Sequence, residues 1–454
     1  MKEHKPAWVI LFILCLVQVA LLEGSSMALP AFPGAQGFGS PTPGGRGGKV
    51  IQVTNLSNSG TGSLRAACEA GGARIVVFRT GGLIDLSSDI YIDDPYLTIA
   101  GQTAPGGGIC IRGGAIRVRT HDVIIRGLRV RPGFTVGTNN DAYAIQNNSV
   151  QPYNIIVDHC SGSWTVDEQY SSWYPAHDYT FSWNIISQAG YGMLIGNYAK
   201  NLSVHHNLFA HITARGPLFK GDTRGEVINN VVYDWENSAT RVKSLCGPND
   251  TENMPSFVNV IGNYYKAGPG TNSRYGVDAD GLTSTKIYVY NNIGPTRTSN
   301  TAPQWNICAA SAAYQSSTPA MTGSGIAAED PNSIYATVLD YAGARVPQRD
   351  SVDANLVNEV RNGTGHRITS DPGWPSYAAG AAPADADHDG MPDSWEQARG
   401  LNASDASDAS RDRNGDGYTN IEEYVNALIP VPNGGNGSDQ TAPAAPRNLH
   451  SVNP

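Results

Sequence analysis

Asn184-Ile185-Ile186 is followed 23 residues later by Asn207-Leu208-Phe209, and after another 23 residues by Asn230-Val231-Val232. Asn263-Tyr264-Tyr265 and Asn292-Ile293 continue the pattern at intervals of 33 and 29 residues. Intervals of this length are typical of a solenoid in which each turn stacks on the previous one. The repeated stretches are short, rich in Val, Ile and Tyr, and separated by Gly, Asn, Asp and Pro, as β-strands are. The sequence therefore predicts an all-β parallel β-helix.

Two other repeat architectures fit less well. A leucine-rich repeat would place Leu at fixed offsets, and a β-propeller would need longer units of four strands each. We expect the recurring Asn to occupy equivalent positions on successive turns, where their amides stack and cap backbone groups at the bends. Four upstream stretches fit the strand series: Tyr96–Ala100, Ala115–Arg119, Val123–Val130 and Asn154–Asp158. Residues 309–335 predict a long loop, and residues 335–360 predict helix packed outside the solenoid.

The N-terminus has the pattern of a secretory signal peptide. A charged stretch (residues 2–5) precedes an apolar run (residues 7–22), and Ser26-Met27-Ala28 supplies the small residues of a cleavage site. An uncleaved membrane anchor is the alternative, but the run is short for a bilayer span. We therefore expect residues 1–28 to be removed. The mature protein would begin near Leu29 and be extracellular, with no membrane contact.

The net charge of −9 is concentrated in one segment. Eleven acidic residues and three Arg between Asp385 and Glu423 give that segment a net charge of −8. The rest of the chain is close to neutral and can accept an anionic polymer, and no basic run argues for nucleic acid. The Cys residues lack the spacing of a zinc site. Among them, Cys246 and Cys308 are a candidate disulfide.

Within the acidic segment, two twelve-residue stretches match the EF-hand calcium loop, which supplies hard oxygen ligands and turns sharply at a Gly. The first offers candidate metal ligands at Asp385, Asp387, Asp389, Asp393 and Glu396, with Gly390 at the turn. The second begins 27 residues later and offers Asp412, Asn414, Asp416, Asn420 and Glu423, with Gly417 at the turn. Two matches at this spacing predict a small EF-hand-like calcium module, placed at residues 379–430.

Three roles for this module remain open. We favour calcium that staples the tail onto the rest of the protein. A dockerin, which would recruit a scaffold partner, is the second interpretation, and a calcium sensor is the least favoured because extracellular calcium is steadily high. Residues 431–454 predict a linker followed by a segment that resembles the start of a fibronectin type III module.

Several motifs stand in order along nearly the whole mature chain. They include Ala31-Phe32-Pro33-Gly34-Ala35-Gln36-Gly37-Phe38-Gly39, Ile99-Ala100-Gly101-Gln102-Thr103-Ala104-Pro105-Gly106, Val157-Asp158-His159-Cys160-Ser161 and Gly343-Ala344-Arg345. With these motifs the sequence resembles the pectate lyases of polysaccharide lyase family 1, in particular secreted bacterial and fungal members with an EF-hand-like tail. The resemblance implies a right-handed parallel β-helix over residues 29–378. It also implies a polygalacturonate/pectin polysaccharide as the partner, and Ca²⁺-assisted β-elimination of polygalacturonate to 4,5-unsaturated oligogalacturonides. We expect a monomer.

The resemblance also implies the catalytic residues. Ala214-Arg215-Gly216-Pro217-Leu218-Phe219-Lys220-Gly221 matches the motif that carries the family's base. Arg215 falls on the catalytic arginine that removes the C5 proton, and Lys220 falls on a basic position that holds a substrate carboxylate. Free arginine is a poor base because it stays protonated, so the site must favour its neutral form transiently. Without the motif, Arg215 would be interpreted as a surface ion-pair residue.

Asp141 and Asp167 match the family's calcium ligands, and the adjacent Glu168 is a third candidate. The alternative for each is a solvated loop carboxylate, which is more plausible for Glu168 than for the other two. Asp158 is predicted to be a structural hydrogen-bonding residue. The family often has an Asp where Ser171 stands, so the ligand set is thinner and calcium would bind firmly only with substrate. Four aromatic residues are candidates for lining the sugar groove or for packing: Tyr170, Trp173, Tyr174 and Tyr191.

Three rival functions make different demands on the sequence. A pectin lyase acts on methyl-esterified polymer and lacks the calcium acids, so Asp141 and Asp167 argue against it. A polygalacturonase shares the fold but hydrolyses with clustered Asp in Asn-Thr-Asp and Gly-His-Gly motifs, which are absent from the sequence. A non-catalytic β-helix that only binds polysaccharide would not need the motif around Arg215.

Overall fold

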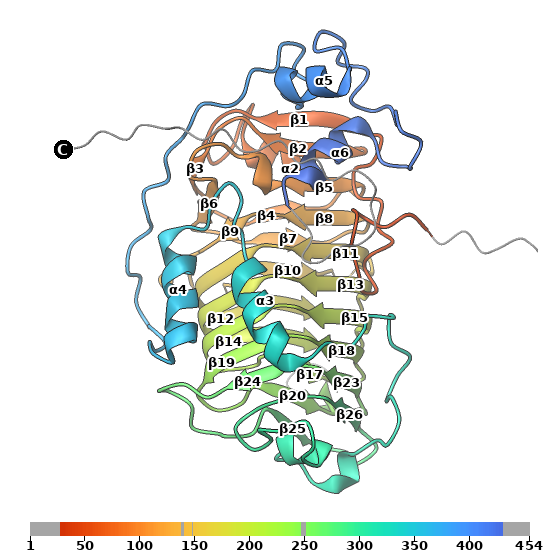
Figure 1. The fold of residues 1–454 in the computed structure, drawn as a ribbon, viewed down its shortest axis with the longest axis vertical. Coiled ribbons are helices and arrows are strands. Elements are labelled where there is room, and N and C mark those ends of the chain that lie inside the picture. The colour runs from red at the N-terminus through yellow and green to blue at the C-terminus, as the bar shows by residue number, and fades with distance from the viewer. Residues whose placement is uncertain (1–27, 138–139, 148, 247–250, 430–454) are drawn as a thin grey trace, which may run out of the picture.

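The computed structural model describes residues 28–137, 140–147, 149–246 and 251–429. Residues 1–27 of the predicted signal peptide and the predicted segment 431–454 lie outside the described residues. Parallel strands stack turn upon turn along the long axis of the molecule (Figure 1). The repeat in the sequence thus predicted the architecture correctly, and the chain is a parallel β-helix.

One wall of the coil is a sheet of ten strands, all parallel, in which each strand pairs with those one turn before and after it. In order along the sheet, the strands are β1 (Lys49–Val53), β2 (Arg74–Phe78), β5 (Leu97–Ala100), β8 (Val123–Arg126), β11 (Tyr153–Asp158), β13 (His177–Ser182), β15 (Lys200–His205), β18 (Arg224–Ile228), β23 (Phe257–Ile261) and β26 (Lys286–Tyr290). We call this sheet the first wall.

The second and third walls share two long strands, β12 (Ser161–Trp173) and β14 (Ile185–Gly196), which continue around the bend between them. The other strands of the second wall are β3 (Gly82–Asp85), β6 (Ile109–Arg112), β9 (Arg129–Val130), β16 (Leu208–Ala214), β19 (Val231–Trp235) and β24 (Tyr264–Lys266). Those of the third wall are β4 (Ile90–Ile92), β7 (Ile116–Val118), β10 (Tyr143–Gln146), β17 (Leu218–Lys220), β20 (Thr240–Lys243) and β25 (Val277–Asp280). A small antiparallel pair, β21 (Leu245–Cys246) and β22 (Glu252–Asn253), stands apart.

The stretch Val123–Val130, predicted as one strand, is two. β8 belongs to the first wall and β9 to the second, and the chain turns between them at Gly127, whose φ is +70°. A positive φ is readily reached by Gly because it has no Cβ. The apolar and basic residues on both sides of Gly127 resemble one continuous strand in the sequence, although the coil turns a corner at this Gly.

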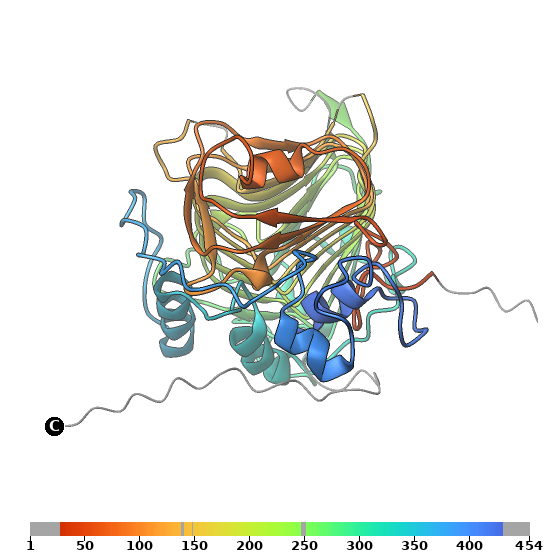
Figure 2. The ribbon, with the colours of Figure 1, turned by 90° about the horizontal axis from the view of Figure 1, so that it is seen from above.

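The hydrophobic core fills the inside of the coil. Figure 2 shows the backbone of the coil from above. The short helix α2 (Leu64–Cys68) closes one end, where Leu64 and Cys68 are fully buried. Two 3₁₀ turns, η3 (Gln304–Ile307) and η4 (Ala312–Tyr314), add Ile307 and Tyr314 to the core at the other end. A further turn, η1 (Gly101–Thr103), follows β5. Covering both ends removes apolar surface and the last strand edges from water.

The recurring Asn form a buried ladder, as the sequence predicted. Each side-chain amide of Asn184, Asn207, Asn230 and Asn263 donates to the side-chain oxygen of the next ladder Asn at 2.9–3.0 Å, and Asn292 ends the series. The backbone N–H of each of the first four donates to that same oxygen. One side chain per turn thus satisfies the polar groups that the bend would otherwise leave unpaired in the interior.

The residue before each ladder Asn adopts a left-handed backbone conformation, with φ of 54° at Trp183, 55° at His206 and 56° at Asn229. This conformation is uncommon for residues other than Gly and Asn, and it turns the chain sharply from the first wall into the second. The rings of Trp183 and His206 stack outside the corner, with centroids 4.3 Å apart. The ladder and the ring stack together hold the strained corners in register.

Two helices cover the outside of the second wall, as predicted for residues 335–360. α3 (Pro331–Tyr341) and α4 (Ser351–Asn362) bury Ile334, Val338, Leu356 and Val360 against residues of β14, β16 and β19. The tail helices α5 (Asp393–Arg399) and α6 (Asn420–Ala427) pack on the outside of the first wall instead, against β1, β2 and β5 (Figure 1).

The candidate disulfide is wrong. Cys246 and Cys308 are both free and buried, as are the other three Cys within the described residues. Cys246 lies in the small β21–β22 pair, where its sulfur approaches Glu252, whereas Cys308 follows η3 at the end of the coil.

Across the described residues, we find no helix that is long and apolar enough to cross a membrane.

Replacing Asn230 by Ala should destabilise the coil. It would leave the backbone N–H of Asn207 without an acceptor in the interior, at about 1–3 kcal/mol. It would also remove one acceptor of the Asn207 side-chain amide, which keeps its hydrogen bonds to the carbonyls of Phe181 and His205. We expect the free energy of unfolding in guanidinium to fall by about 2 kcal/mol. The control is Asn358→Ala, at an exposed site on α4, which should change it by less than about 0.5 kcal/mol. Equal effects of the two variants would contradict the role of the ladder.

Candidate active site

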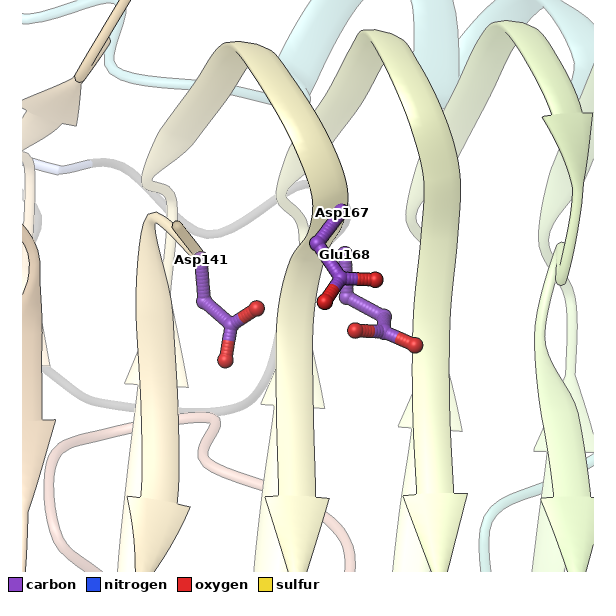
Figure 3. Close-up of side chains that lie close together, drawn as sticks. All are labelled: Asp141, Asp167 and Glu168. Atoms are coloured by element: carbon purple, nitrogen blue, oxygen red, sulfur yellow. The ribbon is translucent and has the colours of Figure 1, made fainter. Parts of the chain in front are cut away.

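Three acidic side chains meet on neighbouring turns of the coil (Figure 3). Asp141 lies just before β10, and Asp167 and Glu168 are consecutive residues within β12. One carboxylate oxygen of each lies within 4.8 Å of the others. The sequence predicted these three residues as metal ligands, and the fold brings them together.

A bulge explains how two consecutive residues face the same cluster. Successive side chains of a regular strand point to opposite faces. Between Thr165 and Glu168, β12 advances three residues while its partner β14 advances two, from Ala189 to Tyr191. The extra residue in β12 is a β-bulge, which redirects side chains locally. Asp167 and Glu168 therefore both reach the cluster.

Asp141 is held in place by two neighbours that the sequence did not single out as its partners. The Ser171 hydroxyl donates to its Oδ2 at 2.6 Å, and the guanidinium of Arg117 lies 3.8 Å from the same oxygen. Burial raises the pKa of Asp141 to about 7, against the lowering effect of these two partners, and Asp167 adds a smaller rise. Burial also raises the pKa of Asp167, opposed by Arg215. The cluster is thus short of positive charge.

Arg215 follows β16 and stands beside the acidic cluster. Its guanidinium forms an ion pair with the buried carboxylate of Glu168 and lies 3.8 Å from the centre of the Tyr191 ring. Its backbone is left-handed, with φ of 65°, and its carbonyl accepts a hydrogen bond from Met193 N–H at 2.6 Å. About a quarter of the side chain is exposed. Arg215 is therefore fixed by its surroundings yet open to a ligand on one side.

Lys220 ends β17, in the third wall, and its ammonium lies 5.5 Å from the centre of the Trp173 ring. Lys243 occupies the same register position one turn later, and Arg241 lies two residues before it. The sequence reasoning missed Lys243, although it follows Lys220 by the same 23-residue interval that separates the first ladder Asn. The inward side chain between these cations is Val242, a core residue, so Arg241 and Lys243 face outward.

The aromatic candidates divide in the structure. Tyr170 is fully buried among core residues and cannot line a sugar groove, because β12 turns it into the coil. Tyr174 is exposed, and Trp173 and Tyr191 are partly exposed beside Lys220 and Arg215. Asp158 is buried and hydrogen bonded to Arg126 and to Ser182, which confirms the structural role predicted for it.

The tail loops differ from each other. In the first loop, Asp385, Asp387 and Asp389 lie together, and Glu396 lies with Asp389 and with Asp408, which the sequence did not assign. Asp393 instead accepts a hydrogen bond from the backbone of Ala386. Within the described part of the chain, the acidic residues of the second loop form no group of three at this spacing. In the second loop, Asp412 and Asp416 accept backbone hydrogen bonds, and the side-chain amide of Asn414 donates to Asp416. The side-chain amide of Asn420 donates to the carbonyl of Asp408. Burial is the main reason that the pKa of Glu423 is raised to about 7.

Known proteins resemble the chain in sequence over most of its length, although no family model matches it. Probable pectate lyase C of Neosartorya fischeri is 35% identical over 432 residues, covering 91% of this chain and 97% of that protein. Its counterpart in Aspergillus fumigatus is 34% identical over 442 residues, with the same coverage. The pectate trisaccharide-lyase of Bacillus licheniformis is 26% identical over 275 residues, covering 55% of this chain and 76% of that protein.

Solved structures show the same fold. A pectate lyase studied for substrate specificity and anti β-elimination aligns with a TM-score of 0.52 and 15% identity, covering 70% of this chain and 98% of that one. A pectate lyase bound to a hexasaccharide aligns with the same score and identity, covering 70% and 99%. The fold is thus the parallel β-helix found in pectate lyases. On the sequence relatives, the chain belongs to the pectate lyases of polysaccharide lyase family 1.

Proposed function

We propose that the protein cleaves polygalacturonate by calcium-assisted β-elimination, with Arg215 as the base that removes the C5 proton. One observation carries this proposal: Arg215 is paired with Glu168, which belongs to a cluster of three carboxylates on neighbouring turns. An arginine with one open side therefore stands beside a candidate cation site.

The cluster suits Ca²⁺ because carboxylate oxygens are the ligands that this hard cation prefers. The raised pKa values of Asp141 and Asp167 reflect burial without enough positive charge, which a bound cation would supply. Asp141, Asp167 and Glu168 would hold the ion. When bound, calcium would stabilise the negative charge that develops on the substrate carboxylate as C5 loses its proton, and would weaken the hold of Glu168 on Arg215.

The protein's own residues would carry the remaining steps. Arg215, in the neutral form that the site must favour transiently, takes the proton from C5. The electrons of that C–H bond form the C4–C5 double bond, and the C4–O bond breaks. The departing oxygen takes up a proton and becomes the hydroxyl end of one product. The guanidinium lies over the Tyr191 ring, 3.8 Å from its centre, and this contact fixes its position. Lys220 and Lys243, on successive turns, attract carboxylates of neighbouring sugars.

We further propose that the protein is exported as a monomer and that the acidic tail is an EF-hand-like calcium module. The packing of α5 and α6 on the first wall favours a staple over a freely presented dockerin, because their apolar residues are buried against β1 and β2. The pectin lyase alternative is disfavoured by the acidic cluster. A polysaccharide-binding protein without catalysis is disfavoured by the pairing of Arg215 with that cluster.

Polygalacturonate incubated with the protein should give a steady rise in ultraviolet absorbance from unsaturated product. A chelator should abolish the rise, and added calcium should restore it, because the acids lose the cation that neutralises the substrate carboxylate. Methyl-esterified pectin is the parallel substrate. Turnover of pectin that is indifferent to chelator would indicate a pectin lyase, and no absorbance change on either polymer would refute the lyase proposal.

Arg215→Lys should lower kcat by at least about a thousandfold, because the ammonium differs from the guanidinium in geometry and cannot take the same position against Glu168 and C5. The matched control is Arg224→Lys, an exposed arginine of the first wall, which should keep full activity. Circular dichroism and the melting temperature would establish that both variants fold. Retained turnover in the folded Arg215→Lys variant would remove this residue from the role of base.

Lys220→Met should raise KM about tenfold and change kcat by less than about threefold, because a carboxylate contact held equally in the ground and transition states contributes to binding alone. Lys243→Met should act in the same direction but more weakly, since Asp280 lies 3.8 Å from its ammonium and offsets part of the charge. Lys49→Met, on the exposed start of β1, is the control. A fall in kcat with KM unchanged would indicate a catalytic role instead.

A further inference from the structure

The tail contains a second group of carboxylates, which are far more buried than carboxylates on a solvent-exposed loop. Asp389, Glu396 and Asp408 lie with one oxygen of each within 4.8 Å of the others, and Asp389 also belongs to the group with Asp385 and Asp387. Glu396 is completely buried, and Asp389 and Asp408 are 3% and 5% exposed. These residues sit on the first loop, on α5 and on the segment that follows α5.

Five carboxylate oxygens of this group are buried without a hydrogen-bond partner. They are Asp387 Oδ2, Asp389 Oδ2, both Oε of Glu396 and Asp408 Oδ1. Leaving one buried charged oxygen unpaired costs several kcal/mol, and charges are buried in proteins when they are paired or bind a metal. Burial, followed by the neighbouring acids, raises the pKa of Asp389 to about 7 and that of Glu396 to about 8.

Asp408 and Asp393 have opposite surroundings. Asp408 Oδ2 accepts a hydrogen bond from the backbone of Asn402 at 3.0 Å, which turns its other oxygen toward Asp389 and Glu396. Asp393, at the loop position where an EF-hand would place a ligand, is engaged with the Ala386 N–H at 2.8 Å. The chain thus brings an acid from outside the twelve-residue loop into the cluster and uses the expected one to fasten the loop.

We propose that Asp387, Asp389, Glu396 and Asp408 form one calcium site, in which Asp408 is a ligand and Asp393 is not. This deepens the calcium-module proposal above and does not depend on the lyase reaction. Four carboxylates, with Glu396 able to bind through both oxygens, supply much of the six to eight oxygen ligands that Ca²⁺ takes. The unpartnered oxygens are the donors that such an ion would satisfy.

The site would also couple calcium to the docking of the tail. Asp385, beside Asp387 and Asp389, accepts a hydrogen bond from Gln52 of β1 at 2.7 Å and lies 3.5 Å from Arg79, just after β2. The carbonyl of Asp408 accepts from Asn420, the first residue of α6. One ion would therefore connect the loop, α5 and the start of α6 to the first turns of the coil. This connection would add to the apolar contacts between the tail helices and the first wall.

Calorimetric titration of calcium into the full chain tests this assignment. Asp141→Asn and Asp167→Asn in the background would remove binding at the catalytic cluster, so that the tail alone is measured. Asp408→Asn, which keeps the acceptor for Asn402, should weaken the tightest binding event at least tenfold and reduce the rise in melting temperature caused by calcium. Asp393→Asn should weaken binding less than about threefold. Asp405→Asn, at a partly exposed site three residues from Asp408, is the matched control and should leave calcium binding unchanged.

Loss of calcium binding in Asp393→Asn but not in Asp408→Asn would overturn the proposal in favour of an ordinary EF-hand loop. Unchanged binding in both variants would also overturn it. Should Asp408→Asn fail to fold, Glu396→Gln, which removes the charge but not the shape of the most buried ligand, gives the same readout. Because binding and melting are measured without substrate, these results stand whether or not the lyase assay succeeds.

Discussion

The bend between the first and second walls is the constraint on which the rest of the molecule depends. At every turn the chain must leave one sheet and enter the next while its backbone is buried, so each bend exposes polar groups to an apolar interior. From Asn184 to Asn292, the ladder satisfies these polar groups with one side-chain amide per turn, which is hydrogen bonded to the amide and the backbone of its neighbours. The left-handed residues before it are tolerated because the ladder holds both sides of the corner.

Because successive turns of the coil stack in strict register, residues that are one turn apart in the sequence lie close together in space. Residues one turn apart become neighbours across about 4.8 Å, so Glu168, Tyr191 and Ala214 stand in line on successive turns. Arg215 follows directly and meets Glu168. The bulge in β12 then adds Asp167 to the same group, and Asp141 reaches it from the turn before. The site is therefore built by a rigid scaffold, with one local irregularity that concentrates the carboxylates.

In two of the places where charge is buried, the acids outnumber their cationic partners. At the cluster of Asp141, Asp167 and Glu168, Arg117 and Arg215 offset part of the charge. In the tail, Arg79 reaches only Asp385, and the oxygens of Glu396 have no partner. Such arrangements are costly unless a cation completes them. The tail also covers the outside of β1 and β2, so the first turns of the coil and the acidic module are stabilised together.

The sequence alone determined the architecture, because the ladder Asn and the apolar residues after them recur at solenoid intervals, and each turn needs one such Asn to satisfy polar groups at its bend. It also led to Arg215, Lys220 and the acids Asp141, Asp167 and Glu168, through motifs that stand in family order. Only the tertiary structure decided contacts between distant segments: the burial of Tyr170, the free state of Cys246 and Cys308, the position of Lys243, and the placement of Asp408 beside Asp389 and Glu396 in the tail. These depend on which face a side chain takes and on which distant segment folds against it, and both are set by packing and register after the chain has closed on itself.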